Sequence, residues 1–193
     1  LAEKGVIVRT WGGAAPAFHP DILERQRQRT EAKSRIAKHA ATLIAEGQTV
    51  MVEAGTTTAL VGKFLFGKRD VQIVTNSALL IPYARANPSL WLTVVGGTFR
   101  PATESFVGPI ALQQLERFHV DLAIVGTDGF SVAGGTSTHL VEGAEIVKKM
   151  STQADQTILL ADSSKYGRRG FVHVLPLTDF DTVLTDDELS DTA

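Results

Sequence analysis

The 193-residue sequence contains no cysteine. Disulfide scaffolds, thiolate zinc sites and a cysteine nucleophile are therefore excluded, and the composition fits a reducing cytoplasm. No apolar run approaches the roughly 18 residues that a membrane-spanning helix needs, and no signal peptide opens the chain. We therefore expect a cytoplasmic protein with no membrane partner.

Metal-ligand spacing and nucleotide-binding loops are also missing. His39, His119 and His173 are scattered in no pattern that is typical of a metal site. The GK[ST] ending of a P-loop and the G-x-G-x-x-G dinucleotide fingerprint are both absent. ATP and NAD are therefore not expected as ligands, and we predict no metal and no cofactor.

Charged residues make up 21% of the chain and are unevenly distributed along it. Residues 1–40 hold eight Lys/Arg against four Asp/Glu, whereas residues 179–191 hold six acids and no base. A basic arm ahead of an acidic body is compatible with nucleic acid near the N-terminus. A charged, solvated helix would give the same pattern, so charge alone leaves both interpretations open.

The N-terminal 46 residues differ in pattern from the rest of the chain. The alternation around Val6 and Val8 predicts a short strand, and Gly12-Gly13 predicts a turn. A single helix is expected from Asp21, a plausible N-cap, to Glu46. Because its first half is polar, we expect this helix to project by that half and to dock by its second half, through an apolar stripe made of Ile36, Ala40, Leu43 and Ile44.

Strands and helices alternate from residue 47 onward. The strand runs are apolar and rich in β-branched residues, as in strands covered on both faces. This alternation predicts an α/β fold with an open, mostly parallel sheet and helices on both faces. The expected strands are 49–54, 71–75, 90–95, 120–125, 156–161, 171–175 and 181–185, and the expected helices are 57–66, 77–86, 109–117 and 140–153.

The loop after the first of these strands, Gly55-Thr56-Thr57-Thr58, is the most informative segment. Ligands of open parallel sheets bind beyond the carboxyl ends of the strands. Free N–H groups at a helix N-terminus, together with three hydroxyls, can hold an anion. Helix capping is the simpler alternative, but three successive hydroxyls exceed what one cap needs. We therefore predict an anion site here.

Other candidate site residues follow the remaining strands. Arg100 and Lys165 could pair with a phosphate, and Asp128 could either bind sugar hydroxyls or form an Asx-turn. Asn76 and Ser77 could equally cap the next helix. Glu142, close to a glycine-rich loop, could reach the same pocket. The full predicted set is Gly55, Thr56, Thr57, Thr58, Asn76, Ser77, Gly97, Arg100, Asp128, Glu142 and Lys165.

In sequence order, these motifs resemble the C-terminal effector-sensing domain of DeoR-type transcriptional regulators. The resemblance covers nearly the whole chain, and its first residues resemble the wing of that family's N-terminal winged helix-turn-helix. It implies a wing remnant at 1–15, a connecting helix at 16–46 and a sensor domain at 47–193. The motifs are Glu53-Ala-Gly-Thr-Thr-Thr, Thr75-Asn-Ser, Gly96-Gly-x-x-Arg100, Asp121 to Gly129, Glu142 to Met150 and Asp162-x-Ser-Lys165-x-Gly167.

The resemblance implies a fold similar to ribose-5-phosphate isomerase, glucosamine-6-phosphate deaminase and the CoA-transferase group. It implies a regulator, usually a repressor, that binds a phosphorylated sugar or related metabolite and contacts DNA through an N-terminal domain missing here. It also implies homodimers or homotetramers. By position, Gly55 to Thr58 would hold the phosphate, and Asn76, Asp128, Glu142 and Lys165 would line the rest of the pocket.

Two positions depart from related patterns. Glu53 stands where the DeoR-type family more often has aspartate. Ala133 stands where ribose-5-phosphate isomerase carries a lysine before its glycine-rich loop. Without that cation, an enediolate intermediate would lack electrostatic stabilisation. We therefore predict binding without turnover and no catalytic residues, with a sugar-phosphate isomerase or deaminase of the same fold as the alternative.

Overall fold

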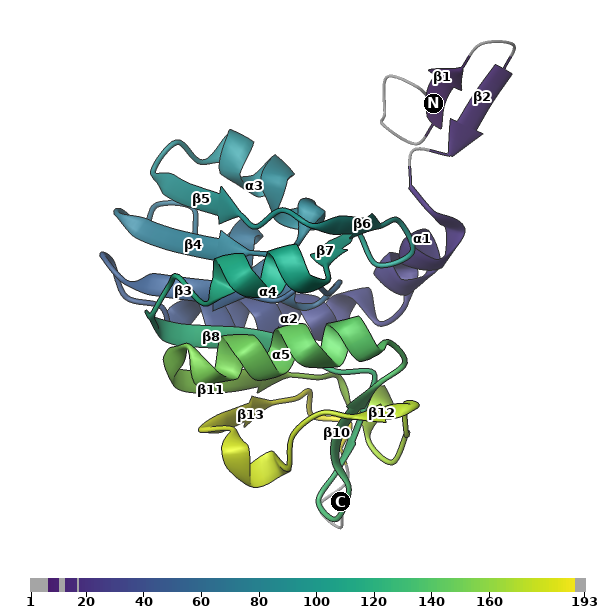
Figure 1. The fold of residues 1–193 in the computed structure, drawn as a ribbon, viewed down its shortest axis with the longest axis vertical. Helices are drawn as coiled ribbons and strands as arrows, with labels where there is room; N and C mark the ends of the chain where they lie inside the picture. The colour runs from purple at the N-terminus through teal and green to yellow at the C-terminus, as the bar shows by residue number, and fades with distance from the viewer. Residues whose placement is uncertain (1–6, 11–12, 17, 190–193) are drawn as a thin grey trace.

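The computed structural model describes residues 7–10, 13–16 and 18–189 and contains a six-stranded, fully parallel central sheet (Figure 1). The strand order β13-β11-β8-β3-β4-β5 places β3 and β8 at the centre. This confirms the predicted α/β class. The strands are β3 (Thr49–Val52), β4 (Val71–Thr75), β5 (Leu90–Val94), β8 (Val120–Gly126), β11 (Ala154–Leu160) and β13 (Thr182–Leu184).

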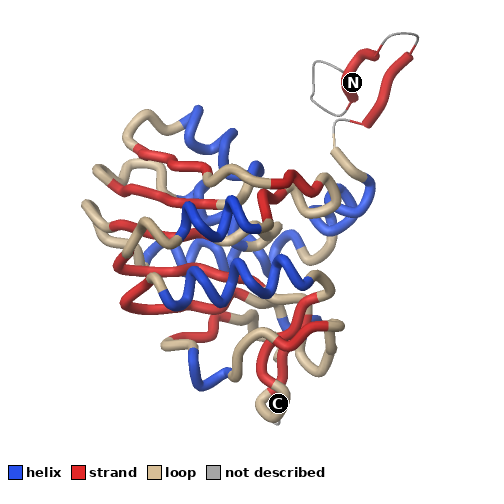
Figure 2. The backbone as a smooth tube through the Cα atoms, in the orientation of Figure 1, coloured by secondary structure: helices blue, strands red, loops and turns tan. Residues whose placement is uncertain are grey.

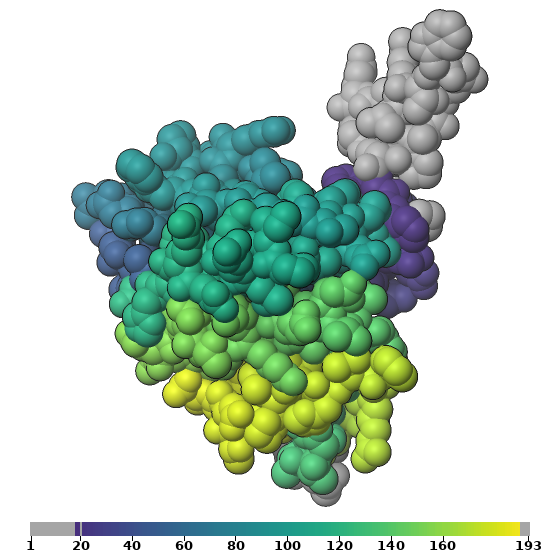
Figure 3. Space-filling model, viewed as in Figure 1, coloured from purple at the N-terminus to yellow at the C-terminus, as the bar shows by residue number. Residues whose placement is uncertain are grey.

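Helices cover both faces of this sheet, as the tube view shows (Figure 2). Residues of α4 and α5 form much of the face seen in the space-filling view (Figure 3). One face carries α2 (Thr30–Thr42), η1 (Thr58–Phe64), η2 (Ala78–Leu80) and α3 (Ile81–Ala86), and the other carries α4 (Pro109–Leu115) and α5 (Val141–Thr152).

The continuous apolar runs of the strands follow from this sandwich arrangement. Val50 and Val52 of β3 belong to the core under α2 and η1, whereas Met51 between them belongs to the core under α4 and α5. All three side chains are fully buried. Because successive strand residues point to opposite faces, a strand with apolar cover on both sides has no position left for a polar residue.

Two of the three small antiparallel sheets among the described residues lie after the first strands of the parallel sheet in the chain and were not predicted. β6 (Thr98–Arg100) pairs with β7 (Ser105–Val107). β9 (Gly129–Ser131), β10 (Gly135–Thr138) and β12 (Val172–His173) form a separate sheet in the order β12-β10-β9. The expected strand 171–175 therefore lies outside the parallel sheet, and η3 (Ser163–Lys165) and η4 (Leu177–Asp179) flank it in the chain.

The predicted single helix over 21–46 is wrong. The structure has α1 (Pro20–Arg27) and α2, separated at Arg29, whose φ of 54° lies in the left-handed region. His19, not Asp21, caps α1, because its Nδ1 accepts a hydrogen bond from the Asp21 N–H at 3.3 Å. The C-terminal half docks through the buried Ile36, Ala40 and Ile44, as expected, although Leu43 is 43% exposed.

The first described residues form an antiparallel hairpin of β1 (Ile7–Thr10) and β2 (Gly13–Pro16). The strand expected around Val8 is therefore present, whereas Val6 and Gly12 lie outside the described residues. The division into wing, connecting helix and sensor stays a prediction. Among the helices that the structure describes, none combines the length and the apolar character needed to cross a bilayer.

Gly129 marks a close approach between chain segments. A Cβ atom there would lie 2.3 Å from the carbonyl oxygen of Arg168, a distance at which the backbone must move. We expect Gly129→Ala to lower the free energy of unfolding by about 1–3 kcal/mol. The matched control is Gly143→Ala, because a Cβ there meets no atom closer than 3.7 Å and alanine favours the interior of α5. Urea denaturation measures both, and equal losses would refute the close-contact explanation.

Candidate functional site

A cleft of about 670 Å³ opens at the carboxyl edge of the central sheet, beyond the ends of β3, β4, β8 and β11. This is the edge at which open parallel sheets bind ligands. Helix α1 and the first turn of α2 border it, so the N-terminal half of the predicted helix lies against the body instead of projecting (Figure 1). The lining includes Arg25, Arg29, Lys33, Glu53, Gly55, Thr56, Thr57, Thr58, Asn76, Asp128, Asp162, Lys165, Arg168 and Arg169.

The Gly55 loop forms one wall of the cleft. The buried Thr58 hydroxyl donates to the Glu53 carbonyl at 2.6 Å, so it holds the loop in shape. A Cβ at Gly55 would lie 2.9 Å from that hydroxyl oxygen, which explains the glycine. Within the described part of the chain, the backbone N–H groups of Gly55, Thr56 and Thr57 have no hydrogen-bond acceptor. The helix that follows, η1, is a seven-residue 3₁₀ helix instead of the expected α-helix.

Lys33 lies against this loop from α2. Its side chain is only 5% exposed, and its ammonium donates to the Thr56 hydroxyl at 3.2 Å and to the Arg25 carbonyl. Burial lowers the pKa of Lys33 to about 8, although the carboxylate of Asp162 acts in the opposite direction. A buried ammonium without a carboxylate partner is costly, so an anion beside it would be stabilising.

Asp128 connects the opposite wall to α1. Its Oδ1 accepts a hydrogen bond from Arg25 at 2.6 Å, and its Oδ2 accepts from the Thr138 hydroxyl and the His139 N–H. Burial alone would raise the pKa of Asp128, but Arg25 and these donors hold it below its ordinary value. The ionised carboxylate therefore ties α1 to the cleft.

Lys165 reaches the cleft from the loop after β11. Buried Asp162 shapes this loop by accepting from the Ser164 N–H at 3.1 Å and from the Ser164 hydroxyl at 2.5 Å. Burial, followed by the charge of Arg25, lowers the pKa of Lys165. Like Lys33, this lysine forms no ion pair within 4 Å among the described residues.

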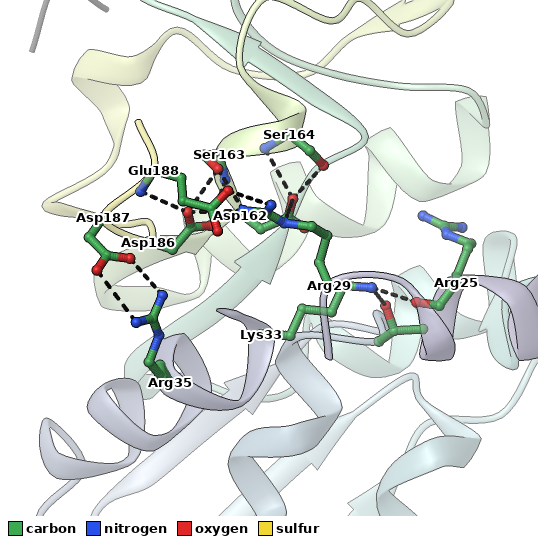
Figure 4. Close-up of polar contacts among 11 residues, drawn as sticks. Arg25, Arg29, Lys33, Arg35, Asp162, Ser163, Ser164, Asp186, Asp187 and Glu188 are labelled. Atoms are coloured by element: carbon green, nitrogen blue, oxygen red, sulfur yellow. Dashed lines mark hydrogen bonds and ion pairs between the residues drawn. The ribbon is translucent and has the colours of Figure 1, made fainter. Parts of the chain in front are cut away.

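Arg29 joins the α1–α2 junction to the same loop and to the acidic C-terminal segment. Its guanidinium donates to the Ser163 hydroxyl at 2.9 Å, to Asp186 at 3.1 Å and to Glu188 at 2.6 Å. Figure 4 shows these side chains converging on Arg29, with the separate Arg35–Asp187 pair beside them. We call Arg29, Ser163, Asp186 and Glu188 the Arg29 cluster. The basic N-terminal arm is thus engaged in part with the protein's own acids.

The structure brings together seven of the eleven predicted residues. Asn76 lines the cleft, but its amide is engaged: Oδ1 accepts from the Ala54 N–H at 2.9 Å and Nδ2 donates to the Phe106 carbonyl at 3.1 Å. Thr58 is likewise used internally. The seven are Gly55, Thr56, Thr57, Thr58, Asn76, Asp128 and Lys165.

The other four predicted residues lie outside the cleft lining. Ser77 is buried and caps η2, accepting from the Leu79 N–H. Gly97 allows a close approach, since a Cβ there would lie 2.6 Å from the Val107 carbonyl oxygen. Arg100 and Glu142 pair with each other at 2.5 Å, both partly exposed. The sequence prediction placed these two in the pocket because it could not see that pairing.

Residues of the cleft that sequence reasoning missed come mainly from two places. Arg25, Arg29 and Lys33 lie in the segment that was expected to project, and Arg168 and Arg169 are exposed residues that follow η3 in the chain. Lys33 interrupts a buried stripe with Ala32 and Ile36, a signal that could have identified it. Among the described residues, no group of three or more His, Cys, Asp or Glu side chains could hold a metal ion.

The family model of the DeoR C-terminal sensor domain matches residues 28–187. The chain is 36% identical to the HTH-type transcriptional regulator GlpR of Haloferax volcanii, over 98% of this chain and 75% of that protein. It is 33% identical to the HTH-type transcriptional repressor GlcR of Bacillus subtilis, over 96% of this chain and 73% of that protein. These relatives are named as regulators and not as enzymes, so the isomerase alternative gains no support.

Solved structures show the same fold at low identity. The probable sor operon regulator of Shigella flexneri matches with a TM-score of 0.56 and 13% identity, over 84% of this chain and 87% of that one. A ribose-5-phosphate isomerase in complex with phospho-erythronic acid matches with a TM-score of 0.51 and 20% identity. This chain spans about half (54%) of that isomerase, and 71% of this chain is covered. The predicted fold group is thereby confirmed.

Proposed function

This chain belongs to the DeoR family of transcriptional regulators, and we propose that its sensor domain binds a phosphorylated sugar or related metabolite as an effector in the cleft. One observation carries this proposal: three free backbone N–H groups at Gly55, Thr56 and Thr57 lie beside the buried ammonium of Lys33. Backbone N–H groups and an ammonium together favour a phosphate group.

The charge balance of the cleft supports an anionic ligand. Arg25 and Arg29 are paired with carboxylates, but Lys33, Lys165, Arg168 and Arg169 form no ion pair among the residues that the structure describes. Burial lowers the pKa of both lysines, so each ammonium lacks compensation. A dianionic phosphate would offset the cost of burying these two ammonium groups, so we expect the cleft to favour phosphorylated ligands.

We further propose that the bound effector alters DNA binding by an N-terminal helix-turn-helix domain, in the manner of a repressor. Helix α1 borders the cleft through Arg25 and follows the β1–β2 hairpin in the chain. A ligand shifts such an equilibrium by its difference in affinity for the two states. Homodimers or homotetramers in the cytoplasm are part of the same proposal.

A thermal-shift panel tests the effector assignment. Ribose 5-phosphate, fructose 1-phosphate, fructose 6-phosphate and glycerol 3-phosphate are compared with the unphosphorylated sugars, because a ligand of the folded state raises the melting temperature. Lys165→Ala is expected to weaken phosphate-ester binding by roughly 1.5–3 kcal/mol, the contribution of a charge-assisted hydrogen bond. Thr57→Val should weaken it as well.

The exposed Lys38 of α2 provides the matched control for this test. Lys38→Ala removes the same charge at a position outside the cleft lining and should leave affinity unchanged. Shifts that are equal for phosphorylated and unphosphorylated sugars, or unchanged affinity in both cleft variants, would place the effector site elsewhere.

A further inference from the structure

Glu53 lines the cleft but has no role in the proposed phosphate site. It follows β3, the central strand, and its Oε2 accepts a hydrogen bond from the Gly126 N–H at the end of neighbouring β8, at 3.1 Å. A Cβ at Gly126 would lie 3.3 Å from that oxygen, and a Cβ at Gly55 would lie 3.7 Å from it. The first contact is tighter than usual and the second is an ordinary one, so it is Gly126 that leaves room for the carboxyl group between the strand ends.

The second carboxyl oxygen of Glu53 faces the cleft without a protein partner. Within the described residues, Oε1 makes no hydrogen bond or ion pair, and it is not among the buried polar atoms that lack a partner. It is therefore accessible from the cleft that Glu53 lines. Water can hydrate this oxygen in the free protein, and a ligand that enters the cleft and displaces that water must offer a hydrogen-bonding group in its place.

Among the residues that the structure describes, none of the cleft cations, Lys165, Arg168 and Arg169 included, forms an ion pair or a hydrogen bond with Glu53. Arg25 pairs with Asp128, and Arg29 pairs with Asp186 and Glu188. Lys33 donates to Thr56 and to a backbone carbonyl. Because the free oxygen of Glu53 has no cationic partner, we expect this carboxyl group to hydrogen-bond to a neutral group of a ligand, such as a hydroxyl group.

We infer that Glu53 is a specificity-determining residue that recognises hydroxyl groups on the carbon skeleton of the effector. This inference rests on the proposed phosphate site at Gly55 to Thr57, which begins two residues after Glu53 in the chain. A phosphate held there places the first carbons of its ester beside the free carboxyl oxygen. Inorganic phosphate, which has no carbon skeleton, makes no use of Glu53.

The protonation of Glu53 fits this role. Burial raises the pKa of Glu53 to about 8, although the hydrogen bond from the Gly126 N–H lowers it; the charge of Asp128 raises it further, and that of Arg25 lowers it. At neutral pH the carboxyl group is therefore largely protonated and can both donate and accept. Hydroxyl groups also do both, so each can complement the other.

The test measures selectivity, defined as the dissociation constant of inorganic phosphate divided by that of each sugar phosphate in the panel. Wild-type protein, Glu53→Ala, Glu53→Gln and Lys33→Met are titrated by calorimetry. Glu53→Ala should reduce the selectivity by about tenfold or more, because a site built around a hydroxyl loses most when that contact is removed. Lys33→Met should weaken both ligands together and leave the selectivity near the wild-type value.

Glu53→Gln keeps an acceptor for the Gly126 N–H and carries the test if Glu53→Ala does not fold. It should also lower the selectivity, because the amide oxygen stays on the Gly126 N–H and the amide nitrogen that then faces the cleft donates but cannot accept from a hydroxyl group. Wild-type selectivity in every folded Glu53 variant would overturn the inference while leaving the phosphate site intact. A wild-type protein that binds none of the phosphates would instead overturn the proposed function, and the inference with it.

Discussion

Replacing Asp186 with alanine is expected to lower the free energy of unfolding by about 3–5 kcal/mol, the usual cost of removing one partner of a buried ion pair. The Asp186 side chain has no solvent exposure. It accepts from the Ser163 N–H and hydroxyl, both at 2.8 Å, and from the Glu188 N–H at 3.1 Å, in addition to Arg29. Alanine would leave the Ser163 and Glu188 N–H groups without their acceptor, and Arg29 would keep only Glu188 and the Ser163 hydroxyl as hydrogen-bond acceptors among the described residues.

The neighbouring Arg35–Asp187 pair supplies the matched control. Its atoms approach to 2.6 Å, but its side chains are 52% and 74% exposed. Asp187→Ala should therefore change the free energy of unfolding by less than about 1 kcal/mol. Urea denaturation at pH 7 compares the two variants, and a similar loss in both would show that burial does not determine the strength of the Arg29 cluster.

The same prediction extends to pH. Burial would raise the pKa of Asp186, but the Ser163 and Glu188 donors and Arg29 together lower it below its unfolded value of 3.8. The folded protein then binds fewer protons than the unfolded chain, so this group stabilises the fold above the unfolded pKa and loses that contribution as pH falls through the folded pKa. Asp186→Ala should lose less stability on acidification than the wild type.

The Arg29 cluster also explains the uneven charge of the sequence. A basic N-terminal arm suggested contact with nucleic acid, yet Arg25, Arg29 and Arg35 all pair with acids of this chain. Opposite charges at the two ends of the sequence are adjacent in the fold, at the edge of the cleft (Figure 4). Ser163, held by this cluster, begins the short helix that presents Lys165 to the cleft, so the cluster supports the candidate site.

Local sequence patterns were sufficient to predict the parallel sheet. The strand over 71–75 is found with the predicted bounds, because β-branched residues, which favour strands, occupy four of its five positions. The glycine-rich strand ends likewise identified the correct edge of the sheet. Those signals depend on residues that are close in sequence, which is why they can be read without a structure.

The remaining errors depend on contacts between distant residues. Arg29 adopts a left-handed conformation that its local sequence does not favour, and its partners Asp186 and Glu188 lie more than 150 positions away. The sequence predicted Glu142 in the pocket, but its carboxylate pairs with Arg100, 42 positions away, and lies outside the cleft lining. No periodic pattern encodes such pairings, because tertiary contacts override local preference.

Lys33→Met is expected to stabilise the ligand-free protein while it removes much of its affinity for phosphate esters. Burial lowers the pKa of Lys33 from 10.5 to about 8, a cost on the order of 3 kcal/mol at neutral pH. Methionine fills a similar volume without a charge. After subtraction of the hydrogen bonds to Thr56 and Arg25, a net gain of about 1–3 kcal/mol in the free energy of unfolding is expected.

Affinity should change in the opposite direction, by roughly 3 kcal/mol or about 100-fold, because the ammonium beside Thr56 is lost. Stability and function would then conflict at one residue, as is typical of binding sites.

In the wild type, the free energy of unfolding should rise between about pH 8 and pH 10.5, because the folded protein releases the Lys33 proton at a lower pH than the unfolded chain does. Lys33→Met should show a smaller rise, to which Lys165, whose pKa is also lowered, still contributes. Lys38→Met, on the exposed side of α2, should keep both the full rise and the affinity. Denaturation curves across this pH range measure the stability, and calorimetric titration measures the affinity. A Lys33→Met variant that is less stable than the wild type would contradict the idea that Lys33 serves ligand binding at the expense of stability.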